Sequence, residues 1–279
     1  MVSYILYRVG AALARLFPRR IAKGVAAVVA FSFFVCRPGI RANVARNFRA
    51  MGMRLRSTFP VFYHFSHAVT DFLRLSFMAP EELASICRIE GREHLDDALR
   101  AGRGAILFAP HLGPWELAGA YLPTLGYRLN TVAHEHPSDR VTRFFSAVRR
   151  RWGLTDFPVR WSARELVGAL ARGEIVVLLV DRSYGRGGVK LRFFGTETVV
   201  PVAHVVLSRR SGAPLVPCCC YYVARERIVV SIGEPITPSE HVSEMDAASA
   251  CLERIEASVR AHADQWFAFD NLWLEENDA

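Results

Sequence analysis

The two residues of this sequence best suited to chemistry are a histidine and a glutamate five positions apart, His111 and Glu116. A neutral imidazole can take a proton from a hydroxyl near pH 7. A carboxylate on its other ring nitrogen would fix the tautomer and stabilise the imidazolium that forms. Since neither serine nor cysteine lies between the two, we expect a hydroxyl of the substrate to be the nucleophile. The prediction is that His111 is the general base and that Glu116 orients it.

The residues around this pair predict a strand, a turn and a helix. An apolar run ending at Phe108 is typical of a buried strand, and Pro110 cannot continue a central ladder. Gly113 and Pro114 favour a turn, and the residues after Trp115 suit a short apolar helix. The pair would then lie at the carboxyl end of a strand, where open α/β sheets place their ligands. The spacing alone also allows an uncoupled loop histidine and helix-start glutamate.

Two further segments predict strands of the same sheet. Residues 174–180 form a near-continuous apolar run, which fits a central parallel strand covered on both faces. This strand would deliver Asp181 and Arg182 to the edge where His111 lies, so both are predicted to bind substrate. Residues 129–133 predict a second parallel strand. We therefore expect an α/β fold with a mixed, largely parallel central sheet and helices on both faces.

A basic helix is predicted from Asp139 to Trp152. Arginine forks bind phosphate with two hydrogen bonds, so Arg149 and Arg151 are candidate phosphate ligands. The alternative is a solvated helix face, with the cations stabilised by the carboxyl end of the helix.

The charge of the chain is concentrated at its beginning. The net charge is +8, and residues 1–80 hold twelve basic residues against one acidic residue, Asp71. A basic, apolar first third on a near-neutral body indicates a module that binds a membrane surface. It would also attract an acidic carrier protein. Because no nucleic-acid-binding module is recognisable, we expect no nucleic-acid partner.

The first forty residues predict membrane-associating helices. Residues 4–17 suit an amphipathic helix, and residues 24–36 are uncharged, a run shorter than the ~18 residues needed to span a bilayer with confidence. We favour an interfacial anchor of one or two helices over a short span or a buried hairpin. The predicted organisation is membrane-associating helices over residues 1–40 and one α/β domain over residues 41–279.

The cysteines and histidines do not predict a metal site. The six cysteines show no C-x-x-C spacing, and three of them, Cys218 to Cys220, follow one another on a predicted strand. His134 and His136 lie close together, but a third ligand is not evident. We expect reduced, buried thiols and no metal.

The box from His111 to Glu116 resembles the H-x-x-x-x-[D/E] motif of the lysophospholipid and glycerol-phosphate acyltransferases. Its glutamate variant resembles the late acyltransferases of lipid A biosynthesis, the lauroyl and myristoyl transferase family. Four other segments resemble later or earlier blocks of that family in the same order: residues 41–47, 181–185, 193–195 and 212–217. The resemblance covers roughly residues 40–270.

This resemblance implies an enzyme that moves a fatty acyl chain from a thioester to a hydroxyl of a lipid or glycolipid, with a lipid A precursor as the family's best-known acceptor. It implies acyl carrier protein or coenzyme A as the donor's carrier, no separate cofactor, and the cytoplasmic face of the bacterial inner membrane as the location. Phe193, Phe194 and Gly195 would pave an acyl-chain groove, although a plain core pair of phenylalanines is the alternative.

The resemblance leaves the acceptor open. Arg182 departs from the family pattern, so another glycolipid, an ornithine lipid or a cell-surface polyene lipid remain possible acceptors. A lysophosphatidate-type phospholipid acyltransferase is a second alternative, but that group usually carries aspartate where Glu116 stands. A non-enzymatic protein that binds membranes or nucleic acid is the third.

Overall fold

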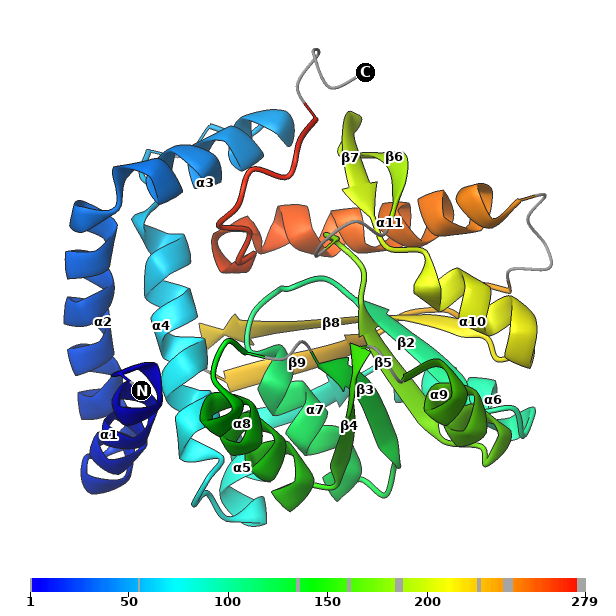
Figure 1. Ribbon diagram of the computed structural model, residues 1–279, viewed down its shortest axis with the longest axis horizontal. Helices are drawn as coiled ribbons and strands as arrows, with labels where there is room; N and C mark the ends of the chain where they lie inside the picture. Colours follow the sequence, from blue (N-terminus) through cyan, green and yellow to red (C-terminus); the bar gives the residue numbers. More distant parts are fainter. Residues whose placement is uncertain are drawn as a thin grey trace.

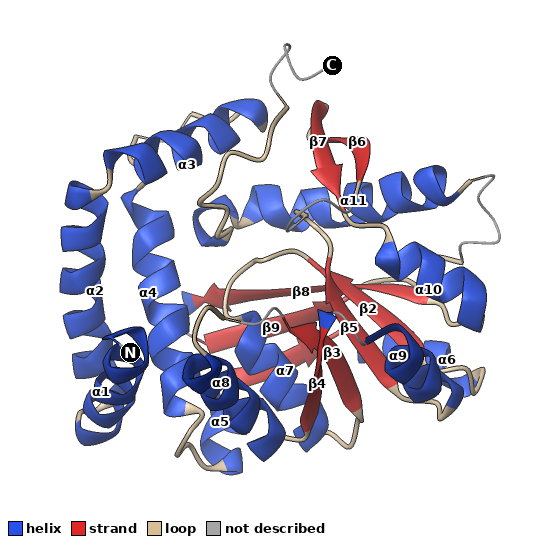
Figure 2. Ribbon diagram, viewed as in Figure 1, coloured by secondary structure: helices blue, strands red, loops and turns tan. Residues whose placement is uncertain are grey.

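The computed structural model describes residues 2–54, 56–133, 136–159, 162–183, 188–224, 227–237 and 243–274. Within these residues a mixed sheet forms the centre, with helices on both faces, as predicted (Figures 1 and 2). The first four helices stand together at one end of the sheet (Figure 1).

The helices are α1 (Val2–Leu16), α2 (Arg19–Cys36), α3 (Pro38–Ala50), α4 (Phe59–Arg74), α5 (Pro80–Ile86), α6 (Arg92–Arg100), α7 (Trp115–Thr124), α8 (Asp139–Arg151), α9 (Ser162–Ala171), α10 (Ala203–Ser211), α11 (Glu244–Ala261) and the short 3-10 helix η4 (Ala263–Gln265). The strands are β1 (Cys87–Glu90), β2 (Ala105–Ala109), β3 (Leu129–Ala133), β4 (Leu154–Pro158), β5 (Ile175–Leu179), β6 (Val189–Phe193), β7 (Thr196–Val200), β8 (Leu215–Val223) and β9 (Arg227–Ile232).

The central sheet has the strand order β1-β9-β8-β2-β5-β3-β4 among the described residues. Its neighbours are parallel except for the pair β8 and β9, which are antiparallel. All five residues of β2 are buried, and β2 lies between β5 and β8, which explains why its sequence is apolar at every position. The expected strands at residues 129–133 and 174–180 are confirmed as β3 and β5.

The pairing of β2 with β5 fixes which side chains meet at the edge of the sheet. Ala109 is in register with Leu179, and the N–H of Val180 donates to the carbonyl of Ala109 at 2.9 Å. His111 lies two residues after Ala109, and Asp181 lies two residues after Leu179. The parallel register therefore brings these two side chains together without any contribution from the intervening loops.

A buried carboxylate is one of the contacts that attach helix α2 to the rest of the protein. Asp71 on α4 is fully buried, and both its oxygens accept hydrogen bonds of 2.7 Å from Arg19. The ammonium of Lys23 lies 2.9 Å from the same carboxylate, and the hydroxyl of Tyr222 on β8 donates to it at 2.7 Å. The cluster ties α2, α4 and the sheet into one body, so contacts cross the predicted boundary near residue 40.

By length and composition, no single helix in the described part of the chain could cross a membrane. Only α2 and α3 taken together pass that test, and they are bent by 92° at the break between them.

We expect Asp71→Asn to lower the free energy of unfolding by about 3–5 kcal/mol, since removing one member of a buried ion cluster leaves uncompensated charge. Burial works to raise the pKa of Asp71, but Arg19 and Lys23 hold the pKa below its usual value. The carboxylate therefore stabilises the fold above pH ~4, and that contribution is lost as the pH falls. Urea unfolding of the variant and the wild type across pH measures both effects.

The matched control is Asp97→Asn, which removes an exposed carboxylate paired with Arg100. It should change stability by no more than about 0.5 kcal/mol. Equal stability of Asp71→Asn and Asp97→Asn at neutral pH would contradict the role of the cluster.

Candidate active site

The residue that holds the imidazole of His111 is Asp181. The Nδ1 of His111 lies 2.7 Å from one carboxylate oxygen of Asp181, and the backbone N–H of His111 donates to the other at 3.0 Å. Asp181 is fully buried and His111 is 6% exposed. With the carboxylate ionised, Nδ1 carries the hydrogen, and Nε2 is the ring nitrogen that can accept a proton.

This arrangement corrects two expectations from the sequence. Glu116 was expected to orient His111, and Asp181 was expected to bind substrate, but it is Asp181 that bonds to Nδ1. The physical reason is the strand register, which places Asp181 opposite His111, whereas Glu116 belongs to the first turn of α7. The spacing within the box could not reveal a partner seventy residues away.

A tryptophan that the sequence analysis missed completes the surroundings of Asp181. The indole N–H of Trp266 donates to the carboxylate at 2.8 Å. Burial works to raise the pKa of Asp181, but the neighbouring His111 and Arg182 and these hydrogen bonds hold the pKa far below its usual value. The carboxylate therefore stays charged. Trp266 belongs to no motif of the sequence, so nothing local pointed to this role.

The turn that carries His111 is clamped by the segment around Trp266. The N–H of Phe267 donates to the carbonyl of His111 at 3.0 Å, and the N–H of Gly113 donates to the carbonyl of Gln265 at 2.8 Å. Gly113 has a φ of 56°, and a Cβ there would lie 2.4 Å from the carbonyl oxygen of Cys220. Only glycine fits this position, so the turn holds the imidazole in one place.

Glu116 instead forms a part-buried ion cluster with Arg149. The guanidinium donates to both carboxylate oxygens, at 3.1 and 2.5 Å, and also to Asp156 at 3.3 Å. Burial works to lower the pKa of Arg149, but Glu116 and Asp156 raise it. The cluster links α7, α8 and β4 beside the catalytic turn. Arg149 and Glu116 both line the cavity described below.

The other predicted phosphate ligands lie in different places. Arg151 donates to the carbonyls of Leu75 and Met78 at 3.0 and 3.1 Å, and it is not among the described residues that line the cavity. Arg182 lines the cavity, and one of its nitrogens donates to the carbonyl of Phe267 at 3.0 Å. The structure thus brings Arg149 and Arg182, but not Arg151, to the site.

The structure places Phe193, Phe194 and Gly195, which were predicted to line an acyl-chain groove, away from the cavity. Phe193 and Phe194 lie at the end of the hairpin β6–β7, and neither lines the cavity. Phe194 has a φ of 53° and Gly195 a φ of 78°, the geometry of a two-residue hairpin turn. The rings pack against Trp266, at centroid distances of 5.9 and 5.8 Å. They belong to the core and support the tryptophan that holds Asp181.

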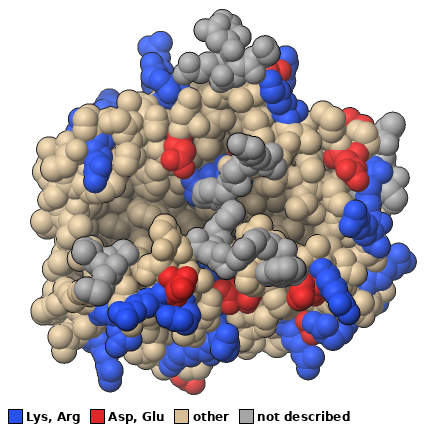
Figure 3. Space-filling view, viewed as in Figure 1, with Lys and Arg blue, Asp and Glu red and all other residues tan. Residues whose placement is uncertain are grey.

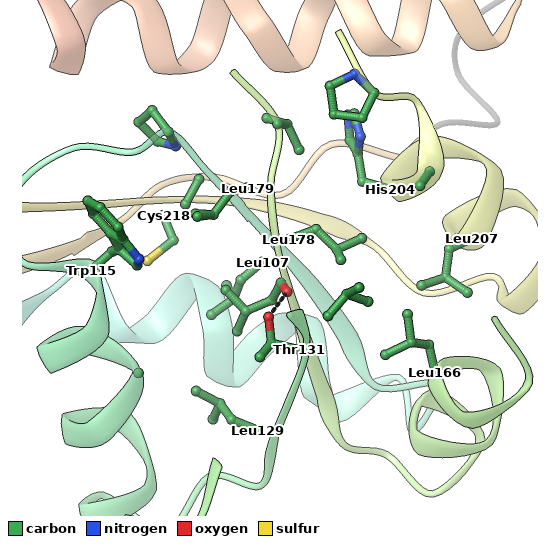
Figure 4. Close-up of a pocket in the computed structure, with 18 of the residues that line it drawn as sticks. Leu107, Trp115, Leu129, Thr131, Leu166, Leu178, Leu179, His204, Leu207 and Cys218 are labelled. Atoms are coloured by element: carbon green, nitrogen blue, oxygen red, sulfur yellow. Dashed lines mark hydrogen bonds between the residues drawn. The ribbon is translucent and has the colours of Figure 1, made fainter. Parts of the chain in front are cut away.

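A cavity of about 690 Å³ opens beside His111. This volume lies within the range of about 300–1,000 Å³ typical of sites for small molecules. Its walls come from α7, α9, α10, β3 and β5 and are mostly leucine, valine and alanine (Figure 4). Polar side chains also contribute to the lining, among them Glu116, Arg149, Arg182 and Ser183, together with His204 and Arg210 of α10.

Two of the predicted buried thiols, Cys218 and Cys220, lie in the wall of this cavity. The described residues contain no group of three or more metal-ligand side chains, and His134 lies outside them. Cys218, Cys219 and Cys220 are buried, and burial raises the pKa of each thiol.

A histidine that bonds to a buried carboxylate and lines an apolar cavity is suited to proton transfer on a substrate with an apolar part. The sequence identifies the class further. The profile of the bacterial lipid A biosynthesis acyltransferase family matches residues 2–275, so the chain belongs to that family. The family resemblance deduced from five short segments is confirmed.

Relatives with more specific descriptions are also similar to this chain. A phosphatidylinositol mannoside acyltransferase of Mycobacterium tuberculosis H37Rv is 31% identical over 193 residues, which cover 67% of this chain and 60% of the relative. A lipid A biosynthesis palmitoleoyltransferase of Escherichia coli K12 is 28% identical over 175 residues, covering 62% and 52%. The chain therefore spans little more than half the length of these relatives.

Among solved structures, a 1-acyl-sn-glycerophosphate acyltransferase from Thermotoga maritima aligns at a TM-score of 0.45 with 16% identity. The alignment covers 88% of this chain and 98% of that one.

We expect Arg149→Met to destabilise the fold by about 3–5 kcal/mol, because it leaves both Glu116 and Asp156 without their guanidinium partner. Glu116→Gln should cost less, because Arg149 keeps its contact with Asp156. The double variant should lose less than the sum of the two, since the Glu116–Arg149 pair is then removed as a unit. Urea unfolding of the four proteins measures the coupling. Additive losses would show that the two side chains do not depend on each other.

Proposed function

We propose that this protein is a membrane-associated O-acyltransferase that moves a fatty acyl chain from an acyl thioester to a hydroxyl of a lipid or glycolipid. The single observation that carries the proposal is the pairing of His111 with Asp181 at the mouth of the apolar cavity. Family membership supports the same chemistry.

The reaction proceeds by direct transfer between the two substrates. The Nε2 of His111 removes the proton of the acceptor hydroxyl as its oxygen attacks the thioester carbonyl carbon. The tetrahedral intermediate collapses, the carbon–sulfur bond breaks, and the imidazolium returns the proton to the departing thiolate. Asp181 stabilises the imidazolium while it exists. The protein supplies no nucleophile and needs no cofactor beyond the donor.

The apolar cavity holds the acyl chain, and the polar end near His111 holds the groups that react. Arg182 lies at this end and supplies positive charge for phosphates of the donor or of the acceptor head group. The acceptor we propose is a glycolipid of the lipid A precursor kind. The family profile supports it, and the similarity to a phosphatidylinositol mannoside acyltransferase supports a sugar-bearing acceptor in general.

The bilayer surface is the proposed location, on the cytoplasmic face of the bacterial inner membrane. Helices α1 and α2 expose large apolar side chains, among them Leu6, Leu16, Val28 and Val29, each at least 64% exposed. The flank of the molecule formed by these helices shows few charged side chains (Figures 1 and 3). Basic residues of the same helices would attract anionic lipid head groups. The cluster around Asp71 then fixes the orientation of the cavity relative to the membrane.

We expect acyl transfer in detergent or liposomes to require the pair His111 and Asp181. His111→Ala and Asp181→Asn should each lower kcat by about 10³–10⁴-fold, the second because the imidazole loses the correct tautomer. Glu116→Gln should lose less activity per folded molecule. Rates are measured with acyl carrier protein and coenzyme A thioesters, each offered to a lipid A precursor, phosphatidylinositol mannoside and lysophosphatidate.

Near-wild-type rates in folded His111→Ala and Asp181→Asn would overturn the proposed function. The donor that supports the faster transfer, and the acceptor that gains the chain by mass spectrometry, identify the substrates.

We expect the double variant Leu6→Asp and Val28→Asp to weaken binding to liposomes by tenfold or more, because burying each apolar side chain is worth about 1.5–3 kcal/mol. Flotation with vesicles containing anionic phospholipid measures the bound fraction. Met245→Asp on α11, where the methionine is 49% exposed, is the matched control and should float like the wild type. Flotation unchanged in the double variant would refute this membrane surface.

A further inference from the structure

The apolar cavity contains a histidine that has no role in the proposed proton transfer. His204 lies in the first turn of α10, is 2% exposed and lines the cavity. Neither of its ring nitrogens has a hydrogen-bond partner among the described residues. Its nearest aromatic neighbour is Phe108, at a ring-centroid distance of 6.0 Å.

Burial keeps this imidazole uncharged, because it lowers the pKa of His204 to about 4. At neutral pH one ring nitrogen is then a donor and the other an acceptor. A buried polar group without a partner costs free energy that an apolar side chain would not. The labelled residues on the same side of the cavity as His204, Leu166 and Leu207, are apolar and offer no hydrogen bond (Figure 4). The group that can form hydrogen bonds with the ring nitrogens of His204 is therefore a ligand in the cavity.

His204 lies well away from the reacting atoms. The ring centroids of Trp115 and His111 are 5.3 Å apart. Trp115 lies on the opposite side of the cavity from His204 (Figure 4). Phe108, whose ring lies near that of His204, precedes His111 by three residues in the chain. An acyl chain with its carbonyl at His111 therefore passes several methylene groups before it reaches His204.

We propose that the cavity selects an acyl chain that carries a hydrogen-bonding oxygen, a hydroxyl or a keto group, part-way along its length, and that His204 binds this oxygen. This inference rests on the proposed function, since it takes the cavity as the acyl-chain site. A hydroxyl can accept from one ring nitrogen and donate to the other, and a keto group accepts from the donor nitrogen.

The test compares acyl thioesters of one chain length that differ in a single group. The donors are a plain saturated chain, a chain with a hydroxyl near the carbonyl, and chains with a hydroxyl or keto group at the middle. The wild type should prefer the mid-chain oxygen over the plain chain by about fivefold to tenfold in kcat/KM, the value of about one hydrogen bond. The hydroxyl near the carbonyl should bring no such gain.

Two variants separate a specific contact from general polarity. His204→Gln keeps a donor and an acceptor and should retain part of the preference, whereas His204→Leu should reverse it in favour of the plain chain. The matched control is His94→Leu, a histidine on α6 that does not line the cavity. It should keep the wild-type preference. A wild type that does not distinguish the donors, or a preference that survives His204→Leu, would overturn the proposal.

Binding without turnover distinguishes failure of this inference from failure of the proposed function. Free fatty acids, plain and mid-chain hydroxylated, are titrated into His111→Ala and into the His111→Ala, His204→Leu double variant by calorimetry. Tighter binding of the hydroxylated acid that disappears in the double variant supports the role of His204 even if no acyl transfer is found. Equal binding of both acids, or tighter binding of the plain acid, shows that His204 hydrogen-bonds only solvent and refutes the inference.

Discussion

The constraint on which the site depends is the parallel pairing of β2 with β5. Because Ala109 is in register with Leu179, the residues two positions beyond each strand face one another, and these are His111 and Asp181. Both strands are in the middle of the sheet, and β2 is buried along its whole length. A pair of side chains placed by two paired strands is held more precisely than one placed by loops, which is how preorganised sites are made.

The rest of the chain keeps this pair in its place by contacts from far away in sequence. Trp266 supplies a hydrogen bond to Asp181, and its neighbours donate to and accept from the backbone of the turn that carries His111. Behind the tryptophan pack Phe193 and Phe194 of the hairpin β6–β7. A hairpin that lies outside the central sheet thus contributes to the site through a chain of packed rings rather than by touching substrate.

The sequence was sufficient for the parts of the fold that depend on local pattern. The apolar runs predicted the buried strands, and the proline and glycine residues predicted the turn after β2. The sequence also placed Asp181 at the same edge as His111, but not as its partner, because strand order and register are long-range properties that no local spacing encodes. For the same reason Phe193 and Phe194 could equally be groove or core, and only their packing against Trp266 decides it. Nothing in the sequence singles out His204, because its lack of hydrogen-bond partners among the described residues is visible only in three dimensions.

Asp181 and Glu116 have different electrostatic partners, and this difference explains why Glu116 lies beside Arg149 rather than beside Nδ1 of His111. An imidazole acts as a base only while it is neutral, and an unpaired carboxylate close to it favours the charged form. Asp181, whose carboxylate bonds to Nδ1 of His111, must remain charged to stabilise the imidazolium when it forms. Glu116 borders the same cavity, but its charge is taken up by Arg149, which donates to both of its oxygens. The guanidinium thus balances the charge of the second carboxylate at the border of the cavity. The five-residue spacing then serves to place an ion pair that fixes α7 against α8 beside the turn, while the register of the sheet supplies the residue that orients the base.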